Sequence, residues 1–281
     1  MLLFIKSTRM KSMISLLLLL FVVCSTVGAQ KSDPNDRRLK VYKPSDTCRT
    51  AIIVCPGGSY CWLSKKYEGS EVARWLNSEG IAAYVLYYPT AGWAGFALRS
   101  RLYFPGRQYP DQLRAIERAM RLVRAEGYRH VGIMGFSAGG HLSLMAAENL
   151  TGPLRPDFIA PIYPVVSLSH AVTHKRSRRG LLGEWRRRSH VMRDSLSMER
   201  HADRIQCPVF LMNCKDDPIV DYRNAMLMDS AMTAHNVPHV YIQYQTGGHG
   251  FGATARKTSP EAIGWKQRFI EWLRRWVESR P

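Results

Sequence analysis

The sequence predicts an α/β fold in which a mostly parallel central sheet carries helices on both faces. Short apolar runs such as residues 50–55 and 81–87 are nearly continuous, which is typical of strands buried on both faces. Segments with one apolar helical face, such as residues 110–126, separate these runs along most of the chain. Because strands that alternate with helices form parallel sheets through right-handed crossovers, we expect one such sheet here.

The individual elements follow from the same patterns and from the glycine and proline residues that end them. We expect strands at about 39–42, which is an edge strand, and at 50–55, 81–87, 131–135, 158–163, 209–213 and 240–244. We expect helices at about 67–78, 110–126, 142–148 and 222–235, and a last helix with Trp265, Phe269, Trp272 and Trp276 on one face. Core packing explains those four rings better than cofactor stacking does.

Two stretches interrupt the alternation. Residues 90–108 are rich in glycine, arginine and aromatic residues, and we expect them to be irregular. Residues 166–206 are basic, low in strand signal and too long for a plain loop, so we expect a small helical insertion over the functional site.

Residues 1–29 have the composition of a secretory signal peptide, and residues 30–281 are expected to form one domain. Three basic residues precede an apolar run, Ile14 to Val23, which is too short to span a bilayer well. Small residues follow, so we expect cleavage after Ala29 and a secreted or periplasmic protein. A lipoprotein processed at Cys24 and an uncleaved anchor are the alternatives. Five cysteines remain after cleavage, so at least one is free or pairs outside the chain.

The motif Gly135-Phe136-Ser137-Ala138-Gly139 stands between a predicted strand and a predicted helix. A serine hydroxyl is a weak nucleophile and must be held where a base can reach it. The turn that holds it is crowded, and glycine at 135 and 139 removes the Cβ atoms that would collide. The helix that follows points its first N–H groups at the position where negative charge develops. We interpret Ser137 as a nucleophile; the alternative is a glycine-rich turn that happens to contain serine.

Three other predicted strands end in residues that complete this chemistry. Pro56 to Tyr60 follow the first buried strand, Lys215 to Pro218 follow a later one, and Gly247 to Gly250 follow the last. In a parallel sheet these strand ends meet at one edge. The chain resembles the α/β-hydrolase family, whose serine, aspartate and histidine follow one another in this order. The resemblance covers nearly the whole chain after residue 29 and implies the α/β-hydrolase fold.

The resemblance implies a role for each residue. Ser137 attacks an acyl carbonyl, His249 takes and returns its proton, and an aspartate orients the imidazole. We choose Asp217, because Asp-Pro-Ile-Val looks like the family's D-x-x-V pattern; Asp216 is the alternative. A surface-loop histidine is the alternative for residue 249, although glycines flank it on both sides.

The loop after the first buried strand resembles the family's His-Gly-Gly-Gly motif, which supplies N–H donors to an oxyanion. We therefore nominate the backbone N–H groups of Gly58, Ser59 and Ala138. Proline replaces the leading histidine and serine the third glycine, so an ordinary turn is the alternative. Within the family, four segments resemble a branch of secreted bacterial acetyl xylan esterases and related esterases of plant polysaccharide breakdown. They are Pro56–Tyr60, Lys66–Gly69, Leu181–Gly183 and Cys207–Phe210.

The formal net charge of +18 falls to +15 once residues 1–29, with three basic residues and no acidic one, are removed. Eight basic residues crowd the predicted insertion: Lys175, Arg176, Arg178, Arg179, Arg186, Arg187, Arg188 and Arg193. Such a cluster can bind phosphates or a membrane surface. The chain has no recognisable nucleic-acid motif, and we expect no nucleic-acid partner and no stable membrane insertion after processing. A solvated face is one interpretation of the cluster, and attraction of an acidic glycan substrate is another.

These patterns together predict a serine hydrolase that cleaves carboxylic esters through an acyl-enzyme. An acetyl or other small acyl group on a carbohydrate, either a small molecule or an oligosaccharide, is the expected substrate. The mechanism needs no metal and no organic cofactor. One alternative is an aminopeptidase-type serine hydrolase of the same fold, and another is a non-catalytic hydrolase-like protein that binds glycan.

Overall fold

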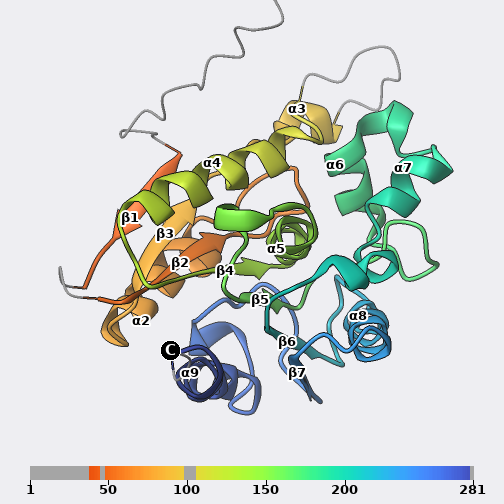
Figure 1. The fold of residues 1–281 in the computed structure, drawn as a ribbon. Coiled ribbons are helices and arrows are strands. Elements are labelled where there is room, and N and C mark those ends of the chain that lie inside the picture. Colours follow the sequence, from red (N-terminus) through yellow and green to blue (C-terminus); the bar gives the residue numbers. More distant parts are fainter. Residues whose placement is uncertain (1–37, 45–47, 98–105, 279–281) are drawn as a thin grey trace, which may run out of the picture. The chain divides into compact units, whose positions relative to one another are not determined.

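The computed structural model describes residues 38–44, 48–97 and 106–278, and seven strands of this part form one mixed sheet (Figure 1). The strands are β1 (Leu39–Tyr42), β2 (Thr50–Cys55), β3 (Ala82–Leu86), β4 (His130–Phe136), β5 (Ile159–Ile162), β6 (Val209–Cys214) and β7 (His239–Tyr244). Their order across the sheet is β1-β3-β2-β4-β5-β6-β7, and only the edge strand β1 is antiparallel to its neighbour within it. Each strand lies within one residue of its predicted bounds, and the predicted fold class is confirmed.

Helices cover both faces of the sheet, as predicted (Figure 1). Helices α4 (Asp111–Ala125), α5 (Ala138–Asn149) and α8 (Arg223–Ala234) pack on the face to which β2 contributes Ile53. Helices α2 (Glu71–Ser78) and α9 (Trp265–Leu273) pack on the opposite face, to which β2 contributes Ile52. Successive strand residues point to opposite faces, so a strand that is apolar throughout supplies both cores.

Three helical segments differ from the sequence predictions. Residues 92–97, expected to be irregular, form the short helix α3 (Gly92–Ala97). A π-helical turn, Lys66–Ser70, precedes α2, which therefore begins later than expected. A second π-helical turn, Arg274–Glu278, follows α9. The wider π turn breaks the 3.6-residue period, so Trp276 leaves the buried face and is 38% exposed, whereas Trp265 is fully buried.

The basic segment 166–206 is helical, as expected. It contains α6 (Lys175–Arg186) and α7 (His190–Ser195), followed by the 3₁₀ turns Met198–Arg200 and Ala202–Arg204. Helix α6 lies beside α3 (Figure 1). The remaining 3₁₀ turns are Gly152–Leu154, Ala255–Lys257 and Ala262–Gly264.

The expected signal peptide, residues 1–29, lies outside the described residues. In the part of the chain that the structure covers, no helix combines the length and the hydropathy needed to cross a bilayer.

Four described cysteines, Cys55, Cys61, Cys207 and Cys214, are buried and carry free thiols. Burial raises the pKa of Cys61 to about 11 and that of Cys207 to about 12. Because the thiolate is the reactive form, these cysteines are chemically quiet and serve as small apolar side chains.

Candidate active site

Three side chains from the carboxyl ends of three strands meet at one edge of the sheet. Ser137 follows β4, Asp217 comes after β6, and His249 comes after β7. The Nε2 atom of His249 lies 2.9 Å from Oγ of Ser137, and its Nδ1 atom lies 2.6 Å from Oδ2 of Asp217. The Asp217 side chain is only 1% exposed and that of His249 only 11%. One imidazole therefore bridges a hydroxyl and a shielded carboxylate.

Ser137 sits in a strained turn between β4 and α5, with φ of 55° and ψ of −116°. A Cβ atom added to Gly135 would lie 2.0 Å from the carbonyl oxygen of Gly139. One added to Gly139 would lie 2.0 Å from the carbonyl oxygen of Cys55. Real Cβ contacts are never this short, so both positions require glycine, for the steric reason that the motif predicted.

The two neighbouring aspartates have different partners. The second carboxylate oxygen of Asp217 accepts the N–H groups of Ile219 and Val220, at 2.8 and 2.9 Å. Asp216 instead accepts the N–H groups of Gly247 and Gly248, at 3.1 and 2.9 Å. Asp217 is therefore the aspartate that contacts the imidazole, and Asp216 shapes the loop that carries it.

The loop after β2, residues 56–60, presents two backbone N–H groups in a fixed direction. The Gly57 carbonyl accepts the N–H of Ser64 at 2.9 Å, and the Gly58 carbonyl accepts the N–H of Cys61 at 2.9 Å. In a trans peptide the N–H points opposite to the carbonyl, so the N–H groups of Gly58 and Ser59 point away from this turn. Neither N–H has a protein acceptor among the described residues. With the first N–H of α5, at Ala138, they are the donors nominated from the sequence.

This loop is strained and lies next to Ser137. Gly58, Ser59 and Tyr60 have φ of 131°, 58° and 60°. A Cβ atom added to Gly57 would lie 2.9 Å from Cβ of Ser137. Two consecutive non-glycine residues with positive φ are costly and persist only where the surroundings impose them, which is typical of functional loops.

Residues 69–280 match the sequence pattern of the prolyl oligopeptidase family. The chain belongs to this family. Its seven-stranded sheet and the serine between β4 and α5 agree with the α/β-hydrolase fold predicted from the sequence.

Two curated relatives and one solved structure are similar to this family member. An acetylxylan esterase of Xylanibacter ruminicola is 32% identical over 230 residues, which are 79% of this chain and 45% of the relative. Endo-1,4-beta-xylanase B of Butyrivibrio fibrisolvens is 27% identical over 227 residues, 73% of this chain and 33% of the relative. The chain thus spans less than half the length of either. The crystal structure of an acetyl ester-xyloside bifunctional hydrolase from Caldicellulosiruptor lactoaceticus has a TM-score of 0.70 and 30% identity, covering 84% of this chain and 87% of that one.

In this family member α6 packs directly on the loop after β2. A Cβ atom added to Gly180 would lie 2.3 Å from the carbonyl oxygen of Ser59. Beside this contact the indole rings of Trp62 and Trp93 stack, with centroids 5.2 Å apart and planes 12° apart. The guanidinium of Arg176, from α6, lies 5.7 Å from the Trp62 ring. Trp93 at the outer end of this aromatic stack is 69% exposed.

Part of the basic cluster holds the insertion together. The guanidinium groups of Arg179 and Arg187 both pair with Glu184, the latter at 2.8 Å. Although burial alone would raise it, these hydrogen bonds hold the pKa of Glu184 below its usual value. Arg179 also donates to the carbonyl of Gly95 at 3.2 Å, which ties α6 to α3. These two arginines therefore stabilise the insertion. The composition of the cluster did not distinguish this role from that of a solvated surface.

Three polar residues near the site were not predicted as functional. Glu68 and Tyr163 are fully or almost fully buried and hydrogen-bonded to each other at 2.9 Å. His174, just before α6, lies close enough to interact electrostatically with His249 and Asp217, and burial lowers its pKa to about 4. Glu68 belongs to the segment that resembles secreted esterases. A single glutamate near the start of a helix, however, gives no sequence signal for a functional role.

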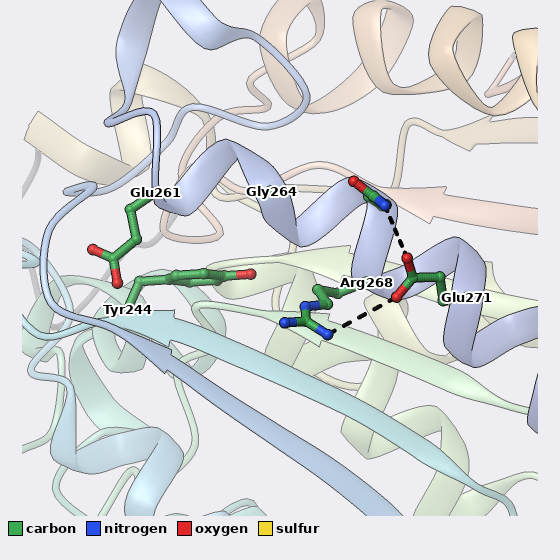
Figure 2. Close-up of a pocket in the computed structure, with 6 residues that line it drawn as sticks. Tyr244, Glu261, Gly264, Arg268 and Glu271 are labelled. Atoms are coloured by element: carbon green, nitrogen blue, oxygen red, sulfur yellow. Dashed lines mark hydrogen bonds and ion pairs between the residues drawn. The ribbon is translucent and has the colours of Figure 1, made fainter.

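A separate hollow of about 420 Å³ lies between the end of β7 and α9 (Figure 2). Its lining includes Tyr244, Glu261, Arg268 and Glu271. Glu271 accepts a hydrogen bond from Gln267 at 2.9 Å and lies 4.0 Å from Arg268. None of the three residues of the candidate site lines this hollow, and the carboxylate of Glu271 already has partners on its own helix.

Proposed function

We propose that this chain is a serine hydrolase that cleaves carboxylic esters through an acyl-enzyme. Ser137 is the nucleophile, His249 the general base and acid, and Asp217 the group that orients the imidazole. The observation that carries the proposal is the continuous hydrogen-bonded connection from Asp217 through His249 to Ser137, next to the backbone N–H groups of the loop after β2.

The geometry supports a definite path for the proton. Asp217 can only accept when ionised, so Nδ1 of His249 carries the hydrogen and Nε2 is left to accept the proton of Ser137. As Oγ attacks the acyl carbon, the carbonyl oxygen becomes negative and receives the N–H groups of Gly58, Ser59 and Ala138. The imidazolium then gives its proton to the leaving alcohol. Water then attacks the acyl carbon while the same imidazole takes its proton. The bond between the acyl carbon and Oγ breaks, and the imidazolium returns the proton to Oγ, which releases the acid and restores Ser137.

A carbohydrate ester, and an acetyl ester in particular, is the substrate class that we propose. The 32% identical acetylxylan esterase supports it, as does the structure of the acetyl ester-xyloside hydrolase at 30% identity. The stack of Trp62 and Trp93 adjoins the loop that would bind the oxyanion, and an exposed indole face packs well against the C–H face of a sugar ring. Arg176 beside this stack would favour acidic sugars, which a steeper loss of kcat/KM with salt on acidic than on neutral esters would support.

A peptidase is the second candidate, because the matching family is named for an oligopeptidase. We expect the protein to hydrolyse p-nitrophenyl acetate and to release acetate from acetylated xylo-oligosaccharides, with little or no turnover of an aminoacyl-nitroanilide. A fluorophosphonate should label Ser137 and stop ester turnover. Nitroanilide turnover without ester turnover would favour the peptidase, and absence of both with no labelling would favour a non-catalytic glycan-binding protein.

Replacing Trp93 by alanine tests the proposed sugar contact. We expect KM for an acetylated xylo-oligosaccharide to rise about three- to tenfold, because an aromatic packing surface is lost. Both kinetic constants for p-nitrophenyl acetate should stay within about twofold, since this ester carries no sugar ring to pack on the stack. Trp185→Ala is the matched control, because this tryptophan of α6 is also exposed, at 73%. Equal KM changes in the two variants would remove the sugar contact from the proposal.

Export is also proposed, on the composition of residues 1–29 alone. N-terminal sequencing of the protein recovered outside the cytoplasm checks it: cleavage after Ala29 is expected, and a lipid-modified Cys24 would point to a lipoprotein instead.

A further inference from the structure

The π-helical turn before α2 carries a buried carboxylate that contacts the loop after β2. Glu68 is 2% exposed, and its Oε2 atom accepts the N–H of Gly57 at 2.9 Å. A Cβ atom added to Gly57 would lie 2.8 Å from this Oε2 and 2.9 Å from Cβ of Ser137. The carboxylate, the loop and the serine are therefore in contact around one small volume.

The other oxygen of Glu68 connects to the loop that carries His249. Tyr163, directly after β5, donates its hydroxyl hydrogen to Oε1 at 2.9 Å. The same hydroxyl oxygen accepts the N–H of Gly252 at 2.9 Å. The Tyr163 ring packs against His249, with ring centroids 4.7 Å apart. A Cβ atom added to Gly252 would lie 2.0 Å from the carbonyl oxygen of Tyr67, so the His249 loop also presses on the turn that carries Glu68.

We propose that Glu68 and Tyr163 are positioning residues that act as one unit, holding the oxyanion-binding loop and the His249 loop in register across Ser137. This inference rests on the proposed serine-hydrolase function and adds two residues to it. Glu68 fixes the peptide before Gly57, and the carbonyl of Gly57 in turn sets the direction of the Gly58 N–H. Tyr163 fixes Gly252 three residues after His249 and supports one face of the imidazole.

The contacts indicate that Glu68 acts as an anion. Both of its oxygens receive donors, a backbone N–H and a phenol O–H, which is the pattern of an ionised carboxylate. Burial raises the pKa of Glu68, while the charge of His249 and the hydrogen bonds from Tyr163 and Gly57 oppose that rise. A buried anion near His249 also favours the positive charge that the imidazole acquires in the transition state.

Positioning of this kind affects the stabilisation of the transition state more than the affinity for the substrate. The N–H groups of the loop must reach the oxyanion, which forms only during the reaction. We therefore expect Glu68→Gln and Tyr163→Phe each to lower kcat for p-nitrophenyl acetate about 10- to 100-fold, with KM within about twofold. If the pair is one unit, the double variant should be no more than about threefold slower than the slower single variant.

The charge provides a second readout that a merely structural residue would not move. Among the described residues, the charged or titratable groups near His249 include Asp217, Glu68, Tyr163 and the neutral His174, with Asp216 bound to the glycines just before it. Glu68→Gln removes a negative charge, so the acid limb of the kcat/KM profile should move to lower pH. Tyr163→Phe leaves the Glu68 carboxylate and the aromatic ring in place, so its acid limb should move less than that of Glu68→Gln.

The matched control is Glu148→Gln on α5. Glu148 is likewise a buried carboxylate, and its charged neighbours are Arg204, Glu199 and Asp203 rather than the site. This variant should keep kcat and the pH profile of the wild-type protein. Thermal unfolding of all variants shows whether each one is folded at the assay temperature, and Tyr163→Phe, which keeps its ring packing, remains informative if Glu68→Gln unfolds.

The rate of Ser137 labelling by a fluorophosphonate keeps this inference separate from the proposed ester substrate, because it reports the reactivity of the serine directly. Slower labelling in both variants supports the positioning pair even if the natural substrate is not an ester. Wild-type labelling and kcat in folded Tyr163→Phe, or fully multiplicative effects in the double variant, would overturn it.

Discussion

Replacing Ser137 by alanine is expected to lower kcat for p-nitrophenyl acetate by about 10⁴- to 10⁶-fold, the largest single effect predicted for this protein. Without Oγ no acyl-enzyme can form, and His249 loses the proton that it is placed to accept at 2.9 Å. The N–H groups proposed to bind the oxyanion remain, so a residual rate above that in water should persist. Steady-state kinetics and loss of fluorophosphonate labelling measure the effect.

Ser143→Ala is the matched control for this experiment. Ser143 is a fully buried serine of α5, and its hydroxyl donates to the carbonyl of Gly140 at 2.8 Å. Removal of the hydroxyl should lower the free energy of unfolding by about 1 kcal/mol and leave kcat within about twofold of the wild-type value. Ester turnover at the wild-type rate in Ser137→Ala would contradict the assignment of the nucleophile.

The sheet could be predicted because it depends on local patterns. Strands such as β2 are apolar throughout, a composition that is typical of strands buried on both faces. The serine could be placed for a similar reason: the steric need for glycine at 135 and 139 acts within five residues and is visible as a motif. His249 could be predicted from the glycines that flank it and from its position after the last strand.

Other features depend on contacts between distant segments and have no local pattern. Glu68 and Tyr163 are 95 residues apart, and only the fold brings the carboxylate to the phenol. The arginines of α6 and of the residues just after it form one charge cluster in the sequence, yet Arg179 and Arg187 pair with the buried Glu184. Trp276 continued the apolar spacing of α9, but a π-helical turn rotates it toward solvent. In each case the decisive interaction lies outside the sequence window in which periodicity is read.

The choice between Asp216 and Asp217 lies between features that a local pattern predicts and features that only the fold determines. The residues are adjacent, so no periodicity separates them, and the preference for Asp217 rested on a resemblance to a pattern. In the structure only the carboxylate of Asp217 lies within hydrogen-bond distance of the imidazole, whereas Asp216 accepts two N–H groups of the glycine loop. The two positions can therefore be tested against each other with the same substitution.

Asp217→Asn is expected to lower kcat about 10³- to 10⁴-fold with little change in KM. The asparagine oxygen can replace Oδ1 and keep the N–H groups of Ile219 and Val220, which leaves the amide NH₂ facing Nδ1 of His249. An NH₂ group only donates, so Nδ1 must then be the unprotonated nitrogen and Nε2 must carry the hydrogen. An imidazole in that tautomer cannot accept the proton of Ser137.

Asp216→Asn provides the comparison, because its amide oxygen can still accept one of the two glycine N–H groups while the tautomer of His249 is unaffected. We expect less than about a tenfold loss of kcat from this weakened loop contact. Steady-state kinetics on p-nitrophenyl acetate, with thermal unfolding to show that both variants are folded, give the ratio of the two effects. A larger loss in Asp216→Asn than in Asp217→Asn would mean that the loop contact, and not the orientation of the imidazole by Asp217, limits the reaction.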